Sequence, residues 1–159
     1  MIKKIISGGH PGAERAALDA AIKLDIHHSG WAYKGRKTDE GILPEEYKVK
    51  ETIDKSFSNR IEKNVLDAGG VVIFSYGKPT VGLKVVEELA SKYKRPCLHI
   101  DFSESYFNVA AAAIRAWLIK NEIDTVYFTG QKSVKDFDIY FEVIRIIEGI
   151  YRFDTEPDG

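Results

Sequence analysis

Short runs of β-branched and apolar residues alternate with longer segments of helical period along nearly the whole chain. The short runs predict strands at residues 2–6, 26–30, 47–52, 71–75, 96–102 and 125–129. The segments of helical period predict helices at 13–24, 54–67, 81–93, 106–121 and 136–151. This alternation is typical of βα units that build a parallel sheet with helices on both faces. We therefore expect an α/β, Rossmann-like three-layer sandwich with a mostly parallel sheet.

The order of the strands in the sheet follows from the handedness of their connections. If the first three strands extend to one side and the last three to the other, right-handed crossovers give the order 3-2-1-4-5-6. The loops after the first and fourth strands then separate, and ligands bind in that crevice in open α/β sheets. These loops are "SGGHPG" (7–12) and "SYGKPTVG" (75–82), and we expect them to form opposing walls of one pocket.

Length and charge narrow the range of partners. The 159 residues fit one ligand-binding domain over residues 1–153, followed by a flexible tail at 154–159. Lysine and arginine (23) nearly balance aspartate and glutamate (24), so no broad basic field attracts nucleic acid or a membrane surface. The lone Cys97 excludes a disulfide framework, and no spacing of histidines indicates a metal site. Without an apolar run long enough to span a bilayer, we expect a cytoplasmic protein.

The two glycine-rich loops indicate a site for an anionic group. Glycine permits positive φ and close approach of a ligand to the backbone, and each following helix begins with unpaired N–H groups. Neither loop matches the dinucleotide fingerprint or the phosphate-loop pattern of nucleoside triphosphatases. Helix ends alone bind anions weakly, so cationic side chains are needed as well. The candidates for that role are Arg15, Lys34, Arg36 and Arg60.

Four segments of the chain resemble a known family. They read "SGGHPGAERAALDAAI", "GWAYKGRKTDEGILPEEY", "NRIEKNVLDAGGVVIFSYG" and "PCLHIDF". Together they are similar to the molybdenum carrier family, whose members resemble molybdenum cofactor carrier proteins. The resemblance implies a Rossmann-like fold related to the LOG phosphoribohydrolases and to the DNA-processing protein DprA. It also implies a phosphorylated small-molecule ligand, with molybdenum cofactor (molybdopterin) as the candidate.

The motifs of the family assign ligand-binding roles to particular residues. The first family motif, S-G-G-Q-T-G-x-D-R, is matched at Gly8, Gly9, Gly12 and Arg15, and this chain departs from it at His10, Pro11 and Glu14. The second motif, G-W-x-x-K-G-R, is matched at Gly30, Trp31, Lys34, Gly35 and Arg36. Arg60 and Asn64 resemble the R-x-x-x-N pair that precedes the central strand in the family.

The complete set of residues expected to bind the ligand joins these motifs to the loops that follow the later strands. We expect contacts from Gly8, Gly9, His10, Gly12, Arg15, Lys34, Gly35, Arg36, Arg60, Asn64, Ser75, Gly77, Thr80, Gly82, Gly130 and Ser133. We assign no catalytic residue and no metal ligand.

Three functions compete at this point. The resemblance favours a carrier that binds a phosphorylated nucleotide-like or pterin ligand. The alternative is a LOG-like nucleoside 5'-monophosphate phosphoribohydrolase, whose chemistry needs a carboxylate near the anomeric carbon. The resemblance to LOG enzymes also implies an arginine on the helix before the loop that holds this acid. Arg60 fits that pattern, but Leu83 stands where the acid is expected, and Glu87 and Glu88 lie about a helical turn further on. A DprA-like binder of single-stranded DNA ranks third, because the charge balance argues against it.

The last predicted helix bears on assembly. The stretch "FDIYFEVIRIIEGIY" is apolar over most of its circumference. Such a helix needs neighbours on more than one side, and one of them can be another subunit. We therefore expect a homodimer or homotetramer.

Overall fold

A computed structural model describes residues 1–104, 107–132 and 139–155 of the chain. Its main sheet has five strands, all parallel to their neighbours, in the order β2-β1-β9-β7-β8. The strands are β1 (Lys4–Ile6), β2 (His27–Ser29), β7 (Gly70–Ser75), β8 (Cys97–Asp101) and β9 (Thr125–Gly130). The helices are α1 (Ala13–Lys23), α2 (Phe57–Asp67), α3 (Val81–Lys92), α4 (Phe107–Lys120) and α5 (Ile139–Thr155).

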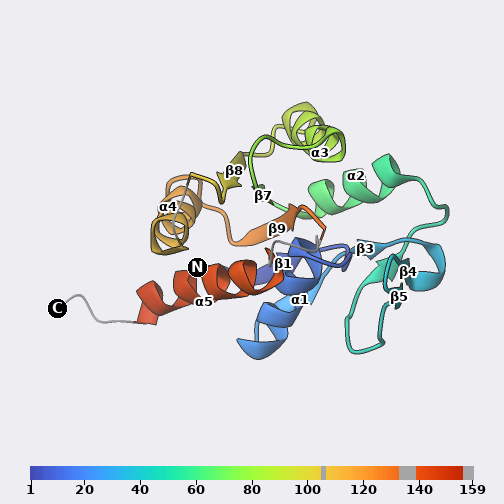
Figure 1. Cartoon of the computed structure of the whole chain (residues 1–159), viewed down its shortest axis with the longest axis horizontal. Helices are drawn as coiled ribbons and strands as arrows, with labels where there is room; N and C mark the ends of the chain where they lie inside the picture. Colours follow the sequence, from blue (N-terminus) through green and yellow to red (C-terminus); the bar gives the residue numbers. More distant parts are fainter. Residues whose placement is uncertain (105–106, 133–138, 156–159) are drawn as a thin grey trace.

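Helices cover both faces of this sheet (Figure 1). Successive side chains of a strand point to opposite faces, so each central strand supplies two separate cores. Ile5 and Phe128 pack with α1, α4 and α5, whereas Ile6 and Tyr127 pack with α2 and α3. This arrangement confirms the predicted α/β, Rossmann-like three-layer fold.

The predicted strand order 3-2-1-4-5-6 is wrong. Strand β9, the last along the chain, lies between β1 and β7 and bonds to both, so in that numbering the order is 2-1-6-4-5. The reason is burial: residues 126–129 of β9 are buried, whereas the residues of β8 are mostly half-buried. A strand that is apolar on both faces gains most from a central place, and a strand with exposed polar residues tolerates the edge.

The segment between β2 and α2 leaves the main sheet. Only two residues of the predicted strand 47–52 form a strand, β6 (Lys50–Glu51), which pairs with β3 (Trp31–Ala32) in a separate parallel pair. Between them lie the 3-10 turn η1 (Lys34–Arg36) and a hairpin of β4 (Lys37–Thr38) with β5 (Gly41–Ile42). A small core anchors this excursion to α1, and it consists of Leu18, Ala32, Leu43 and Tyr47.

Arg36 holds the backbone of the segment between β2 and α2 in place. Its guanidinium donates hydrogen bonds to the carbonyl oxygens of four residues, at 2.6 to 3.2 Å, which are Leu43, Pro44, Tyr47 and Val49. These bonds use four of the five N–H groups that an arginine carries. The side chain expected to bind the ligand therefore organises the backbone of its own loop.

Helix α5 finds its neighbours within the same chain. It packs against α1 and α4, and its buried residues are Ile139, Val143, Ile146, Ile147 and Ile150. Most of the apolar surface of α5 is thus covered within the chain, Phe141 is 59 % exposed, and the homodimer or homotetramer stays a prediction. The helix reaches Thr155, two residues into the tail expected at 154–159, and residues 156–159 lie outside the described part. None of the described helices has the length and apolar character needed to cross a membrane.

The role of Arg36 leads to a stability prediction. Arg36→Ala should lower the free energy of unfolding by about 2 to 4 kcal/mol, because several carbonyl groups lose a charged donor at once. Urea denaturation measures the change. Lys34→Ala is the matched control, since Lys34 is an exposed cation in the same turn, and its effect should stay within about 0.5 kcal/mol. Equal stability of the two variants would contradict the assigned role.

Candidate functional site

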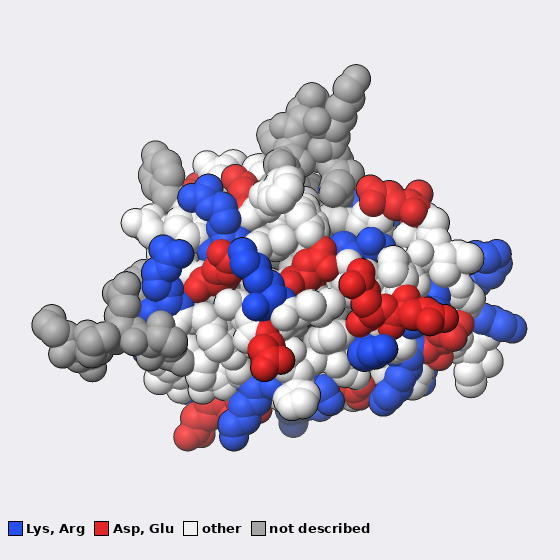
Figure 2. Space-filling model, turned by 90° about the horizontal axis from the view of Figure 1, so that it is seen from below, with Lys and Arg blue, Asp and Glu red and all other residues white. Residues whose placement is uncertain are grey.

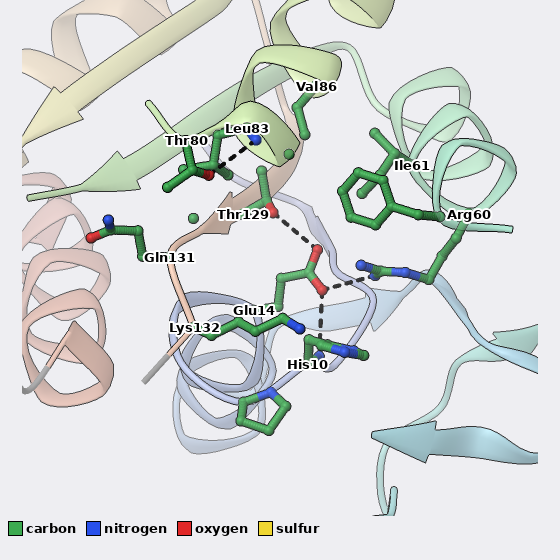
Figure 3. A pocket seen from close by; sticks show the side chains of 14 residues that line it. His10, Glu14, Arg60, Ile61, Thr80, Leu83, Val86, Thr129, Gln131 and Lys132 are labelled. Atoms are coloured by element: carbon green, nitrogen blue, oxygen red, sulfur yellow. Dashed lines mark hydrogen bonds and ion pairs between the residues drawn. The ribbon is translucent and has the colours of Figure 1, made fainter. Parts of the chain in front are cut away.

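A pocket of about 290 Å³ lies at the carboxyl ends of β1 and β9, between α2 and the start of α3 (Figure 3). This is the edge of a parallel sheet at which ligands bind in open α/β proteins. The pocket is lined by His10, Pro11, Glu14, Phe57, Arg60, Ile61, Thr80, Gly82, Leu83, Val86, Thr129, Gly130, Gln131 and Lys132.

Two helices give the pocket apolar walls. Phe57 and Ile61 are four residues apart on α2, and Leu83 and Val86 are three apart on α3, so each pair shares one helix face. Phe57 is the most exposed of the four, at 38 %, and it can meet a ligand without moving. Facing apolar walls of this kind are suited to a ring system.

A buried ion pair forms the polar side of the pocket. Arg60 Nη1 donates to Glu14 Oε1 at 2.9 Å, and both side chains are 4 % exposed. The other carboxylate oxygen, Oε2, accepts hydrogen bonds from Tyr127 at 2.6 Å and from Thr129 at 3.0 Å. The backbone N–H of His10 also points to Oε1, at 3.4 Å. Strands, helices and loop therefore converge on one carboxylate.

These contacts fix the ionisation of the pair. Burial by itself raises the pKa of Glu14, but the charge of Arg60 and the hydrogen bond from Tyr127 outweigh burial and hold that pKa below its usual value. Burial lowers the pKa of Arg60, yet the Glu14 carboxylate outweighs it and raises the pKa. The pKa of Tyr127 is raised by burial and by Glu14. The pair is therefore ionised at neutral pH, and Tyr127 serves as a neutral donor.

The first glycine loop turns its polar groups inward. The Gly9 N–H donates to Ser7 Oγ at 3.2 Å, and this hydroxyl donates to the Glu14 carbonyl at 2.7 Å. The N–H of Ala13, at the start of α1, donates to the Gln131 carbonyl at 3.2 Å. The loop expected to hold an external anion therefore bonds groups of the protein, and its His10 N–H points to the Glu14 carboxylate.

Three glycines of this loop are required by its conformation and by the position of Arg60. A Cβ at Gly8 would lie 1.8 Å from Arg60 Nη1, so only glycine leaves room for the guanidinium. Gly9 and Gly12 adopt positive φ, at +76° and +102°, which favours glycine at both positions.

Arg60 also provides a free donor. Its guanidinium lies over the rings of Tyr33 and Phe57, at 4.7 and 5.9 Å from the ring centroids. The buried Nε has no hydrogen-bond acceptor in the described part of the chain. An unpaired buried donor costs stability, which is a cost of holding Arg60 against Glu14 and the two rings.

The mouth of the pocket carries a second polar group of residues. Lys132, just after β9, forms an ion pair with Asp39 of the β4–β5 hairpin at 2.7 Å. His10 Nε2 lies 4.0 Å from Asp39 Oδ1. Burial lowers the pKa of His10, and the charges of Arg60 and Lys132 lower it further against the opposing effect of Glu14. His10 is therefore a neutral ring at pH 7.

Five of the predicted ligand-binding residues line the pocket, and they are His10, Arg60, Thr80, Gly82 and Gly130. Arg15 does not, since its Nε donates to the Gly9 carbonyl at 3.0 Å and its guanidinium lies over the Tyr47 ring. Asn64 is also occupied, because its amide bonds both the N–H and the carbonyl of Trp31. Ser133 lies outside the described residues.

Other predicted residues belong to neighbouring structures. Ser75 donates to the Gly77 carbonyl at 2.7 Å and bonds His99 at 2.5 Å, and the Gly77 N–H donates to Asp101 at 2.7 Å. These contacts shape the turn after β7 beside β8, not the pocket. Lys34 lines a separate hollow, next to Gly35 and Arg36 in the turn η1.

Sequence reasoning missed the carboxylate partner of Arg60 and the apolar walls. It searched for the acid after Thr80, and neither Glu87 nor Glu88 lines the pocket. Glu14, which does, is 46 residues from Arg60 along the chain. The available signal was an acidic residue within an alanine-rich helix that follows a glycine loop. The walls were detectable as apolar residues at the start of α2 and α3.

Comparisons with known proteins place the chain in a family. The sequence profile described as "Circularly permutated YpsA SLOG family" matches residues 5–151. The chain belongs to this family. It is also similar to the crystal structure of a "Putative molybdenum carrier protein" from Syntrophus aciditrophicus SB, with 42 % identity, 94 % of each chain covered and a TM-score of 0.90. No curated protein matches. The family resemblance drawn from the motifs is thus confirmed.

Circular permutation, which the family's description names, is consistent with the position of β9. In a permuted chain, strands that were neighbours come to lie at opposite ends of the sequence. Here β1, near the start, pairs in parallel with β9, near the end, and β9 supplies Tyr127 and Thr129 to the Glu14 carboxylate.

The buried pair can be tested by a double-mutant cycle. Glu14→Gln and Arg60→Met should each lower the free energy of unfolding by about 3 to 5 kcal/mol, because each leaves the other polar group buried without its partner. The double variant should lose at least about 1 kcal/mol less than the sum, as expected for residues in contact. Urea denaturation of the four proteins measures the coupling. Strictly additive losses would show that the two side chains do not act together.

The ionisation of Glu14 predicts a pH dependence. Its pKa is lower in the folded than in the unfolded chain, so its contribution is complete above the unfolded value of about 4.3 and is lost as the pH falls through the folded value. The stability difference between wild type and Glu14→Gln should therefore be constant near pH 7 and shrink below about pH 4. Denaturant titrations from pH 7 to 3 test this. A difference independent of pH over that range would exclude an ionised Glu14.

Proposed function

We propose that the protein is a carrier that binds a small phosphorylated ring compound, nucleotide-like or pterin, in the pocket between α2 and α3. The observation that carries this proposal is that apolar walls and the buried guanidinium of Arg60 line one pocket. The similar protein from Syntrophus aciditrophicus SB is named for molybdenum carriage, which makes molybdopterin the leading candidate ligand.

The size of the pocket sets a limit on the ligand. Its volume of about 290 Å³ is at the low end of the range, about 300 to 1,000 Å³, that small-molecule sites occupy. In this proposal one ring system lies against Phe57 and Leu83, and its substituents extend toward the mouth. There Lys132 offers a positive charge and the first turn of α3 offers N–H groups.

A molybdenum ion would be bound by the pterin ligand and not by side chains of the protein. No cluster of three or more His, Cys, Asp or Glu side chains in residues 1–104, 107–132 and 139–155 is placed to hold a metal ion. The chain would therefore recognise the pterin ring through the apolar walls and the anionic part through Arg60 and Lys132.

The state of Glu14 favours binding over hydrolysis. A general acid or base works best with a pKa near the operating pH. The pKa of Glu14 is held low, and four donors already bond its carboxylate. Its task is then to hold Arg60 and the surrounding loops in place.

A LOG-like phosphoribohydrolase is the second candidate, and one observation favours it. The reaction needs a carboxylate beside an arginine, and Glu14 and Arg60 bring these groups together at the wall of the pocket. For this activity Glu14 would have to reach the sugar of the ligand from its nearly buried position.

The ring-binding role predicts the effect of one wall residue. Phe57→Ala should weaken AMP binding by about 5- to 100-fold, the loss expected when a base loses an aromatic stacking partner. Leu66→Ala is the matched control, because Leu66 is an exposed apolar residue at the other end of α2 and should leave binding unchanged. Isothermal titration calorimetry measures both affinities.

Two further measurements test whether the protein is a carrier or a hydrolase. Native mass spectrometry of the purified protein should detect a co-purified pterin or nucleotide, and a protein that carries no ligand and binds no AMP would refute the carrier. Wild-type protein kept with AMP should leave it intact, as chromatography can verify. Release of free adenine would establish the hydrolase instead, and Glu87→Gln should then keep that activity.

A further inference from the structure

Acidic and basic side chains are interspersed on the face shown in Figure 2, so that face offers an anion no broad basic patch. A local group of basic side chains surrounds a hollow of about 170 Å³ beside the pocket. It is lined by Tyr33, Lys34, Lys37 and Lys55, and we name it the lysine hollow. In the described part of the chain, none of the three ammonium groups has a hydrogen-bond acceptor or an ion-pair partner. Three uncompensated like charges around one hollow repel one another, and a bound anion would remove that repulsion.

The backbone that carries two of these lysines is held in an unusual form. Gly35 and Arg36 both have positive φ, at +79° and +58°, and the second costs energy because Arg36 has a Cβ. The Gly35 N–H donates to the Glu51 carboxylate at 2.7 Å, and the Lys37 stem lies along the Gly35 backbone. With Arg36 bonded to four carbonyls as described, the turn presents its lysines from a fixed backbone.

Two carboxylates on neighbouring segments hydrogen-bond groups other than the three lysines. Glu51 accepts the Gly35 N–H, and Asp54 accepts hydrogen bonds from the Ser56 N–H and the Asn59 side chain. Neither carboxylate lines the lysine hollow. Neither carboxylate forms an ion pair with Lys34, Lys37 or Lys55.

Tyr33 connects the lysine hollow to the pocket. Its ring lines the hollow on one side. On the other side the ring lies 4.7 Å from the Arg60 guanidinium and 5.4 Å from the His10 ring, and both of these residues line the pocket. A single aromatic side chain therefore separates the apolar pocket from the three lysines.

We propose that the lysine hollow binds the terminal phosphate of the ligand whose ring occupies the pocket, so that the preferred ligand carries a diphosphate. The proposal rests on the proposed function for the ring, whereas the anion site itself rests on the three lysines and the fixed turn. The first phosphate lies at the pocket mouth, and the second extends past Tyr33. The chemical class is a nucleoside diphosphate, or a pterin with a diphosphate.

Calorimetry with three probes tests the lysine hollow on the full-length chain. Wild type should bind ADP at least tenfold more tightly than AMP, and it should bind inorganic pyrophosphate. The double variant Lys34→Gln/Lys55→Gln should lose this preference and bind pyrophosphate at least tenfold more weakly, with AMP affinity within twofold of wild type. The control Lys92→Gln/Lys120→Gln removes the same charge from the ends of α3 and α4 and should behave as wild type.

The outcomes separate the two proposals. Equal affinities for ADP and AMP in wild type, or equal losses in the test and control variants, would overturn the lysine hollow and leave the ring pocket standing. Lysine-dependent binding of pyrophosphate without binding of either nucleotide would support the hollow and refute nucleotide binding in the pocket. Binding of none of the three probes would overturn both. Thermal melting of each variant verifies that the fold is retained, as expected for exposed lysines.

Discussion

The structure around the pocket depends on the buried ion pair between Glu14 and Arg60. Removing two charges from water is costly, and only good geometry with additional hydrogen bonds repays it. That requirement ties the start of α1 to α2 and, through Tyr127 and Thr129, to the central strand β9. It also explains why the glycine loop is closed inward, since Gly8 gives the guanidinium its space. The α2 wall of the pocket is therefore positioned by this pair before any ligand binds.

Much of the fold could be predicted because its periodic signals are strong. The helices lie within a few residues of their predicted bounds, and the α/β class follows from their alternation with strands. The place of β9 could not be predicted, because crossover handedness constrains how strands connect without fixing which gap a late strand fills. The pairing of β3 with β6 was missed for another reason: two-residue strands carry no periodicity.

The candidate site was predictable in outline and not in its chemistry. The glycine loops at strand ends indicated His10 and Gly82, and both line the pocket, because the local sequence determines where a strand-to-helix turn forms. Local sequence does not determine the partner of a charged side chain, because Glu14 and Arg60 meet only after distant segments pack. Arg36 illustrates the same limit, since a guanidinium that binds a phosphate and one that binds backbone carbonyls look identical in sequence.

The central place of β9 affects how the molecule is made. During synthesis the ribosome releases β1 and β7 well before residues 125–130, so the two strands that will flank β9 have unpaired edges for that time. Unpaired strand edges are the sites at which incomplete chains associate with one another. The Glu14 carboxylate likewise lacks its Tyr127 and Thr129 donors until that strand arrives. The sheet and the pocket are therefore completed together, late in synthesis. A chain that ends before β9 would expose strand edges that associate with other chains, and it would lack the pocket.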